Sequence, residues 1–168
     1  VAVMLILAGV AVPVSSGVVR KAKQNSSRAE MVNLQKALQG YGRDMGIRSG
    51  QTQWGPFAPE TSGAGSYSPS LGLDLEEDVD ALGWDRYLKK GWNGPYITGQ
   101  PETADADGIG APETVRTYQI DTWGRYYVYS NQKSGSTRTV TLTSGGPDRD
   151  PATATDNLSL EVYRGPDW

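Results

Sequence analysis

The order of apolar and polar positions divides the chain into an uncharged N-terminal stretch and a polar remainder. Residues 1–19 carry no charged side chain. A helix over them would reach ~28 Å, close to the thickness of the hydrocarbon core of a membrane. The stretch fits three readings: a membrane-spanning helix that later packs among identical helices, a buried core helix, or a cleaved secretion signal. Basic residues follow the run instead of preceding it, and a small domain has little interior for a helix apolar on all sides, so the first reading is favoured.

The helical pattern continues beyond Arg20 with a different character. Apolar residues now recur at spacings of three and four, with polar residues on the other faces. This stripe consists of Met31, Leu34, Ala37, Leu38, Tyr41 and Met45. The glycines that follow predict that the helix ends near Tyr41 or Asp44. Within the first half, Pro13 predicts a kink or a locally melted turn between residues 9 and 17.

Most of the remaining chain reads as loops followed by short strands. Alternation of Val, Thr, Tyr and Ile with polar residues predicts strands at 115–121, 125–130, 137–144 and 158–163, with a turn at 130–136. Richness in Gly, Pro and acidic residues predicts loops at 50–70 and 101–112, and a short helix is expected at 76–82. Three residues after it, Trp84, Tyr87 and Leu88, are candidate core anchors.

Together these elements predict an α+β fold. A small antiparallel sheet packed on the apolar stripe would bury both the stripe and one sheet face, with Tyr127 and Tyr129 on one side and Tyr126 and Val128 on the other. Residues 1–19 form the membrane or filament-core half of the helix in this reading. Residues 20–168 form the globular domain, which includes the amphipathic half of the helix at about 20–44.

Composition narrows the possible chemistry. The 168 residues contain 16 Lys and Arg against 19 Asp and Glu, a net charge of -3, which disfavours nucleic-acid binding. Cysteine and histidine are both absent, which excludes disulfides, thiolate and imidazole metal sites and histidine-based catalysis. A pair of carboxylates such as Asp105 and Asp107 could serve glycoside hydrolysis, but an ordinary turn explains their spacing more simply. A non-enzymatic role is therefore expected.

The segment 144–157 is the candidate metal site. It has no predicted secondary structure and almost no apolar side chain, so either it is a solvated turn or something other than hydrophobic burial holds it. Its hard oxygen donors suit calcium, which takes six to eight oxygens in flexible geometry, although the spacing is not that of an EF-hand. The candidate donors are Ser144, Asp148, Asp150, Asp156, Asn157 and a carbonyl of Leu142 or Thr143.

The order of motifs resembles a known family. The helix sequence LQKALQGY, then GWNGPYI at 91–97, DTWGRYY at 121–127 and SGGPD at 144–148 resemble the major, G-type pseudopilins of type II secretion systems, within the type IV pilin superfamily. The resemblance implies calcium in the loop before the last strand, with Asp148 and Asp156 as carboxylate ligands and Asn157, Ser144 and a Leu142 or Thr143 carbonyl beside them.

The same resemblance implies a function and a location. The chain would be a structural subunit of a helical filament that supports protein secretion across the outer membrane, with minor pseudopilins and an inner-membrane assembly platform as partners. Before assembly it would sit in the bacterial inner membrane as a single-pass protein, contacting lipid, with its C-terminal domain in the periplasm. The alternative is a membrane-anchored periplasmic binding module whose exposed aromatic residues, such as Trp54, Phe57 and Trp92, hold a ligand; core packing is the simpler reading of these residues.

Overall fold

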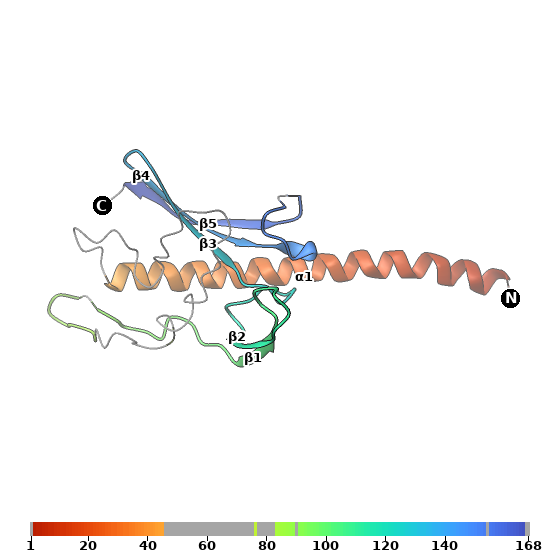
Figure 1. Ribbon diagram of the computed structural model, residues 1–168, viewed down its shortest axis with the longest axis horizontal. Helices are drawn as coiled ribbons and strands as arrows, with labels where there is room; N and C mark the ends of the chain where they lie inside the picture. The colour runs from red at the N-terminus through yellow and green to blue at the C-terminus, as the bar shows by residue number, and fades with distance from the viewer. Residues whose placement is uncertain (1, 46–75, 77–82, 90, 154, 167–168) are drawn as a thin grey trace.

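The computed structural model places one long helix, α1 (Ala2–Met45), against two small antiparallel sheets (Figure 1). The structure describes the backbone of residues 2–45, 76, 83–89, 91–153 and 155–166, and the side chains of these residues except at 2–16, 45, 131–133, 138 and 166. The long helix and the two antiparallel sheets confirm the expected α+β class. The predicted loop at 50–70 and all but one residue of the predicted helix at 76–82 lie outside the described residues.

The larger sheet is a meander of three strands in the order β3–β4–β5. Its strands are β3 (Val128–Ser134), β4 (Thr137–Ser144) and β5 (Leu158–Pro166), and the 3-10 helix η3 (Gly146–Asp148) lies in the connection between the last two. The smaller sheet is a hairpin of β1 (Pro101–Ala104) and β2 (Glu113–Arg116). In Figure 1 the meander lies on one side of the C-terminal half of α1 and the hairpin on the other.

The main core forms where the meander packs on the apolar stripe of α1. From the helix it contains Met31, Leu34, Ala37, Leu38 and Tyr41, as the periodicity predicts. From the sheet side it contains Tyr118, Trp123, Tyr127, Tyr129, Val140, Leu142, Leu158 and Val162. Two glutamine side chains of α1 fasten β5 at its backbone, because Gln35 Nε2 donates to the Glu161 carbonyl at 2.7 Å and Gln39 Nε2 to the Val162 carbonyl at 3.0 Å.

A second, smaller core is separate from the first. It contains Ala106, Val115, Ile120 and Tyr126. The neighbouring tyrosines therefore point to different cores, with Tyr127 and Tyr129 in the first and Tyr126 in the second, as their alternation predicts. Burial, with a hydrogen bond to Glu113, raises the pKa of Tyr126 to about 12.

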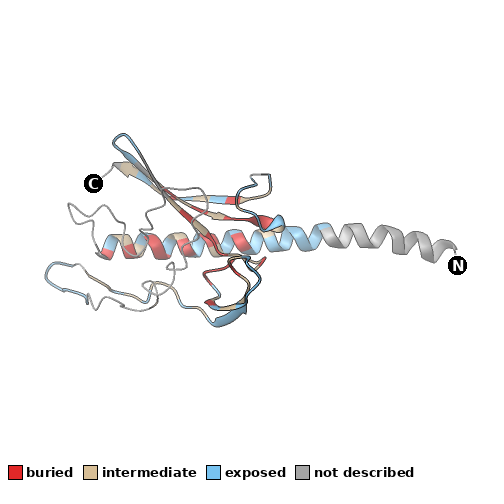
Figure 2. Ribbon diagram, viewed as in Figure 1, coloured by how far each residue is buried: buried red, intermediate tan, exposed pale blue. Residues whose placement is uncertain are grey.

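The N-terminal half of α1 extends away from the body of the protein (Figure 1). Its helix is uninterrupted, so the melted turn expected near Pro13 is not formed: a proline removes one N–H donor, and the neighbouring turns of this helix continue around it. Residues 17–23 are all exposed, with Val18 at 62% and Val19 at 56% (Figure 2). Within the described residues no helix is long and apolar enough to cross a membrane; residues 1–16 of the proposed membrane segment have no described side chains.

Several predicted elements were wrong in place or kind. Residues 101–104, expected to be loop, form β1, because they pair with 113–116 across a hairpin. The predicted strand 115–121 is shorter and earlier, as β2, and is followed by a turn and a single bridge between Ile120 and Tyr126. The expected turn at 130–136 is mostly strand, since β3 runs to Ser134 in register with β4.

Three expected core anchors are exposed instead. Trp84 is 40%, Tyr87 89% and Leu88 70% exposed. They lie in or next to a tight turn in which the Asp85 carboxylate accepts hydrogen bonds from the backbone amides of Tyr87 and Leu88, at 2.8 and 3.0 Å. The segment therefore folds as a turn with its large apolar side chains exposed, and its aromatic content was not a sign of burial.

Candidate metal site

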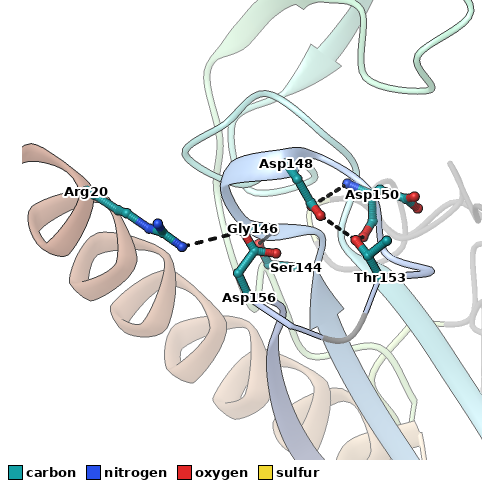
Figure 3. Close-up of polar contacts among 7 residues, drawn as sticks. All are labelled: Arg20, Ser144, Gly146, Asp148, Asp150, Thr153 and Asp156. Carbon is teal, nitrogen blue, oxygen red and sulfur yellow. Dashed lines mark hydrogen bonds and ion pairs between the residues drawn. The ribbon is translucent and has the colours of Figure 1, made fainter. Parts of the chain in front are cut away.

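The candidate loop is closed at its base by the larger sheet. Ser144 is the last residue of β4 and pairs in register with Leu158, the first residue of β5. Because these two residues are neighbours, the loop between them returns to its own beginning, which brings Asp156 beside η3 (Figure 3). The sequence predicted the strands on either side, and their pairing is what gathers the dispersed oxygen donors.

Ser144 anchors the start of the loop to a buried aspartate. Its hydroxyl donates to Asp121 Oδ2 at 2.6 Å and accepts a hydrogen bond from the Gly146 amide at 3.2 Å. Asp121 Oδ1 accepts the amides of Trp123 and Arg125 at 2.9 and 3.0 Å. Burial raises the pKa of Asp121, and these hydrogen bonds oppose the rise. The side chain of Ser144 is therefore engaged in fixing the loop onto the Asp121 turn.

Asp148 and Asp150 organise the exposed side of the loop. Asp148 Oδ1 accepts a hydrogen bond from the Asp150 amide at 3.0 Å, and Asp148 Oδ2 accepts one from the hydroxyl of Thr153. The Asp150 carboxylate accepts a hydrogen bond from the Ala152 amide at 2.9 Å. The hydrogen bond from Thr153, then that from the Asp150 amide, lowers the pKa of Asp148, and Asp156 contributes to the same lowering. The lowered pKa keeps Asp148 a carboxylate, and Asp150 is used in a turn.

Asp156 and Asn157 carry the unsatisfied oxygens of the loop. The Asn157 side chain donates from Nδ2 to the Pro151 carbonyl at 2.9 Å. Its Oδ1 and the Oδ1 of Asp156 are both buried, with no hydrogen-bond partner among the described residues. A buried acceptor without a partner costs about 1–3 kcal/mol, so two in adjacent residues call for an explanation.

The backbone at Gly146 comes close to Asp156. Gly146 has a φ of +68°, and a Cβ there would lie 2.5 Å from the Asp156 carbonyl oxygen and 3.3 Å from its Oδ1. Only glycine permits this approach of the two ends of the loop. The sequence showed this residue as part of SGGPD, but not the contact that requires it.

These donors fit calcium in kind. Carboxylate and amide oxygens are the ligands calcium prefers, and the two oxygens without partners are of these two types. Within the described residues no group of three or more acidic side chains is close enough to hold a metal ion. The remaining ligands would then be carbonyls and water. Leu142 lies in the central strand β4, fully buried and paired with Tyr129 and Leu160 on its two sides.

The second acidic run is a turn in which both aspartates accept hydrogen bonds from backbone amides. Asp105 Oδ1 accepts the Gly110 amide and Asp107 Oδ1 the Ile109 amide, both at 3.0 Å. The Arg125 guanidinium lies 3.5 Å from Asp105 Oδ2 and donates to the Asp105 carbonyl at 2.8 Å. This arrangement agrees with the turn interpretation of Asp105 and Asp107.

Both aromatic motifs serve as contacts between the domain and α1. In the first, the Gly91 amide donates to the Asp44 carbonyl at 2.9 Å, and the Tyr96 hydroxyl donates to Asp44 Oδ2 at 3.2 Å. The Tyr96 ring packs edge-on against Tyr41, with ring centroids 5.6 Å apart. Trp92 packs edge-on against Tyr96 and lies, partly buried, against the main core, which agrees with core packing as the simpler interpretation of this residue. Trp54 and Phe57 lie outside the described residues.

The second motif docks near the middle of the helix. Thr122 follows Asp121, and its hydroxyl lies 2.9 Å from the hydroxyl of Ser27, which is fully buried. The Thr122 hydroxyl also donates to the Lys23 carbonyl at 3.2 Å. Sequence reasoning missed Asp121 and Thr122 as organising residues, although the DTWG motif was the available signal.

In comparisons with protein-family models, with curated proteins and with solved structures, nothing matches the chain.

Proposed function

We propose that the chain is the structural, non-enzymatic subunit of a pseudopilus or related type IV pilin-like filament, with calcium bound in the loop between β4 and β5. The observation that carries the proposal is the division of α1. Its C-terminal half is covered by the domain, while residues 17–19, the last residues of the uncharged segment 1–19, are exposed, as are residues 20–23 that follow them.

The physical reason is that an uncharged helix of this length, unless covered by its own domain, needs a cover other than water. Lipid can provide it before assembly, and the same helices of other copies can provide it afterwards. Burying half of such a run at ~25 cal/mol per Å² of apolar surface is worth on the order of ten kcal/mol per subunit before entropy is subtracted. In this proposal the chain is held in the inner membrane with its domain in the periplasm. It then assembles with its own copies, minor pseudopilins and an assembly platform to support secretion.

Assembly is tested by placing a charge on the exposed half of α1. We expect Val18→Asp to abolish filaments when detergent is removed from the purified chain, because a carboxylate would be buried between helices without a partner. The matched variant Val18→Leu should still form filaments in electron micrographs. Since Val18 is 62% exposed, neither change should alter the melting temperature of the domain in detergent. Wild-type chain that stays monomeric without detergent would refute the proposal.

Calcium has a separate role in the proposal. Asp148, Asp156 and Asn157 would hold it with their side-chain oxygens, and an ion there would supply the positive charge that the oxygens without partners lack. It would join the start of β5 to η3 and stabilise the folded chain by mass action.

The calcium part of the proposal is tested by thermal unfolding with calcium and with a chelator. The wild type should melt higher with calcium, and Asp148→Ala and Asp156→Ala should lose most of that difference. Asp107→Ala is the matched control, because it removes a loop carboxylate that only caps a turn. Equal melting temperatures of the wild type with and without calcium would refute the proposed calcium binding.

A further inference from the structure

Arg20 joins α1 to the candidate calcium loop at the place where the helix leaves the domain. Its guanidinium Nη2 lies 3.7 Å from Asp156 Oδ2, as Figure 3 shows. The side chain of Arg20 is 56% exposed, whereas that of Asp156 is 15% exposed. The contact therefore joins a largely solvated cation to a carboxylate that is mostly buried in the loop.

The charge of Asp156 is only partly balanced by this contact. A separation of 3.7 Å is too long for a hydrogen bond but short enough for an ion pair. The other oxygen of Asp156 is buried and has no hydrogen-bond partner among the described residues. Within the described residues, Arg20 is also the one cation within 4 Å of this carboxylate.

We propose that Arg20 is the counter-ion of Asp156 in the calcium-free protein and that calcium displaces it. The inference rests on the proposed calcium binding. Two cations at one carboxylate repel each other, and calcium has the higher charge and engages further oxygens that the guanidinium does not reach. Arg20 can leave at little cost because most of its side chain is already in water. Calcium occupancy is then linked to the charge that α1 presents next to its uncharged segment.

The proposal predicts opposite effects of one substitution under two conditions. Without calcium, Arg20→Gln should lower the melting temperature by roughly 1–4 °C, the range for loss of one exposed ion pair. With calcium titrated by calorimetry, the same variant should bind the ion about two- to fivefold more tightly, because the competing cation is gone. Both measurements use the whole chain in detergent micelles.

Lys21→Gln is the matched control. It removes the same charge one residue away, from an exposed side chain that makes no ion pair with the described residues. We expect its calcium affinity and its calcium-free melting temperature to equal those of the wild type. As a direct readout, the Nε signal of Arg20 in NMR spectra, assigned by its loss in Arg20→Gln, should move toward that of a solvated arginine when calcium is added.

The outcomes separate the inference from the proposal beneath it. If calcium has no effect on the wild type, both fail. If calcium stabilises the wild type but Arg20→Gln binds it with equal or lower affinity, calcium binding stands and displacement of Arg20 is refuted. If Lys21→Gln binds more tightly to the same degree as Arg20→Gln, the effect is one of overall charge and the specific contact is refuted.

Discussion

The two halves of α1 are one continuous helix in two different surroundings. In the C-terminal half, Met31, Leu34 and Leu38 are 2%, 1% and 0% exposed, whereas Val18 and Val19 in the other half are 62% and 56% exposed (Figure 2). Most helical stability in proteins comes from packing of an apolar face. The C-terminal half of α1 therefore draws stability from the domain, and residues 17–23 of the N-terminal half do not. The difference shows that the domain covers the C-terminal half and leaves residues 17–23 of the other half uncovered.

The transition between the halves is marked by polar contacts. Among residues 17–44 of α1, Ser27 is the first that is fully buried, and its hydroxyl lies 2.9 Å from that of Thr122. Arg20, two turns earlier, contacts Asp156. Both contacts come from segments that connect strands of the domain, and both are linked through Asp121 and Ser144. The last contacts before the helix leaves the domain, at Ser27 and Arg20, are therefore made by loops and not by strands.

The largest predicted effect tests the packed half directly. Leu38→Ala should lower the free energy of unfolding by about 2–5 kcal/mol, because it leaves a cavity in a fully buried site. Val18→Ala, the same kind of truncation in the extended half, should change it by no more than about 0.5 kcal/mol. Denaturant unfolding of the chain in detergent measures both. Similar losses from both variants would mean that the two halves are not differently covered within one chain.

The packed half was also the part that the sequence predicted best. A stripe at spacings of three and four can have only one buried side on a helix, so the core residues of α1 followed from periodicity. Trp84, Tyr87 and Leu88 were misjudged because aromatic content says nothing about the direction in which a turn points its side chains. The end of β3 was missed because Asn131, Gln132 and Lys133 are polar, and pairing with β4 holds them in the strand.

The candidate site was predictable in composition but not in geometry. The acidic residues of the loop were evident from the sequence, but the different hydrogen-bonding role of each was not. Which oxygens cap turns and which remain without partners depends on the pairing of β4 with β5 and on Gly146. The contact between Arg20 and Asp156 joins opposite ends of the chain, and no local pattern reports it.

The next largest effect is expected at Asp121, which links the candidate loop to the turn that docks on α1. Asp121→Ala should cost about 2–3 kcal/mol, because it leaves the Ser144 hydroxyl and two backbone amides without their acceptor. Asp121→Asn keeps an acceptor for the two amides and should cost less. Ser130→Ala, a half-buried serine in β3, is a control expected to stay within about 0.5 kcal/mol.

The same residue gives a pH dependence. Burial raises the pKa of Asp121 above its usual value of 3.8, so the folded chain holds this proton more tightly than the unfolded chain. As pH rises through the usual value and then through the raised one, the wild type should lose stability relative to Asp121→Asn. Unfolding curves measured from about pH 3 to pH 7 test this. A gap between the two proteins that stays constant or moves the other way would show that Asp121 is not held against ionisation.

The smallest effect concerns the hydrogen bond at the transition itself. Thr122→Val removes the hydroxyl that contacts Ser27 and the Lys23 carbonyl but keeps the shape of the side chain. We expect a loss of about 1 kcal/mol, because the hydroxyl of the fully buried Ser27 loses one of its hydrogen-bond partners and keeps the longer bond from the Thr122 amide, at 3.3 Å. Thr103→Val, on the exposed face of β1, should change stability by less than about 0.5 kcal/mol. Hydrogen exchange of the α1 amides near Ser27 should quicken in Thr122→Val while those near Leu38 stay protected, because this bond holds only the end of the packed half. Uniform quickening along the helix would instead mean that the packed half opens as one unit with its boundary, and the level at which the helix leaves the domain would not be set by this contact.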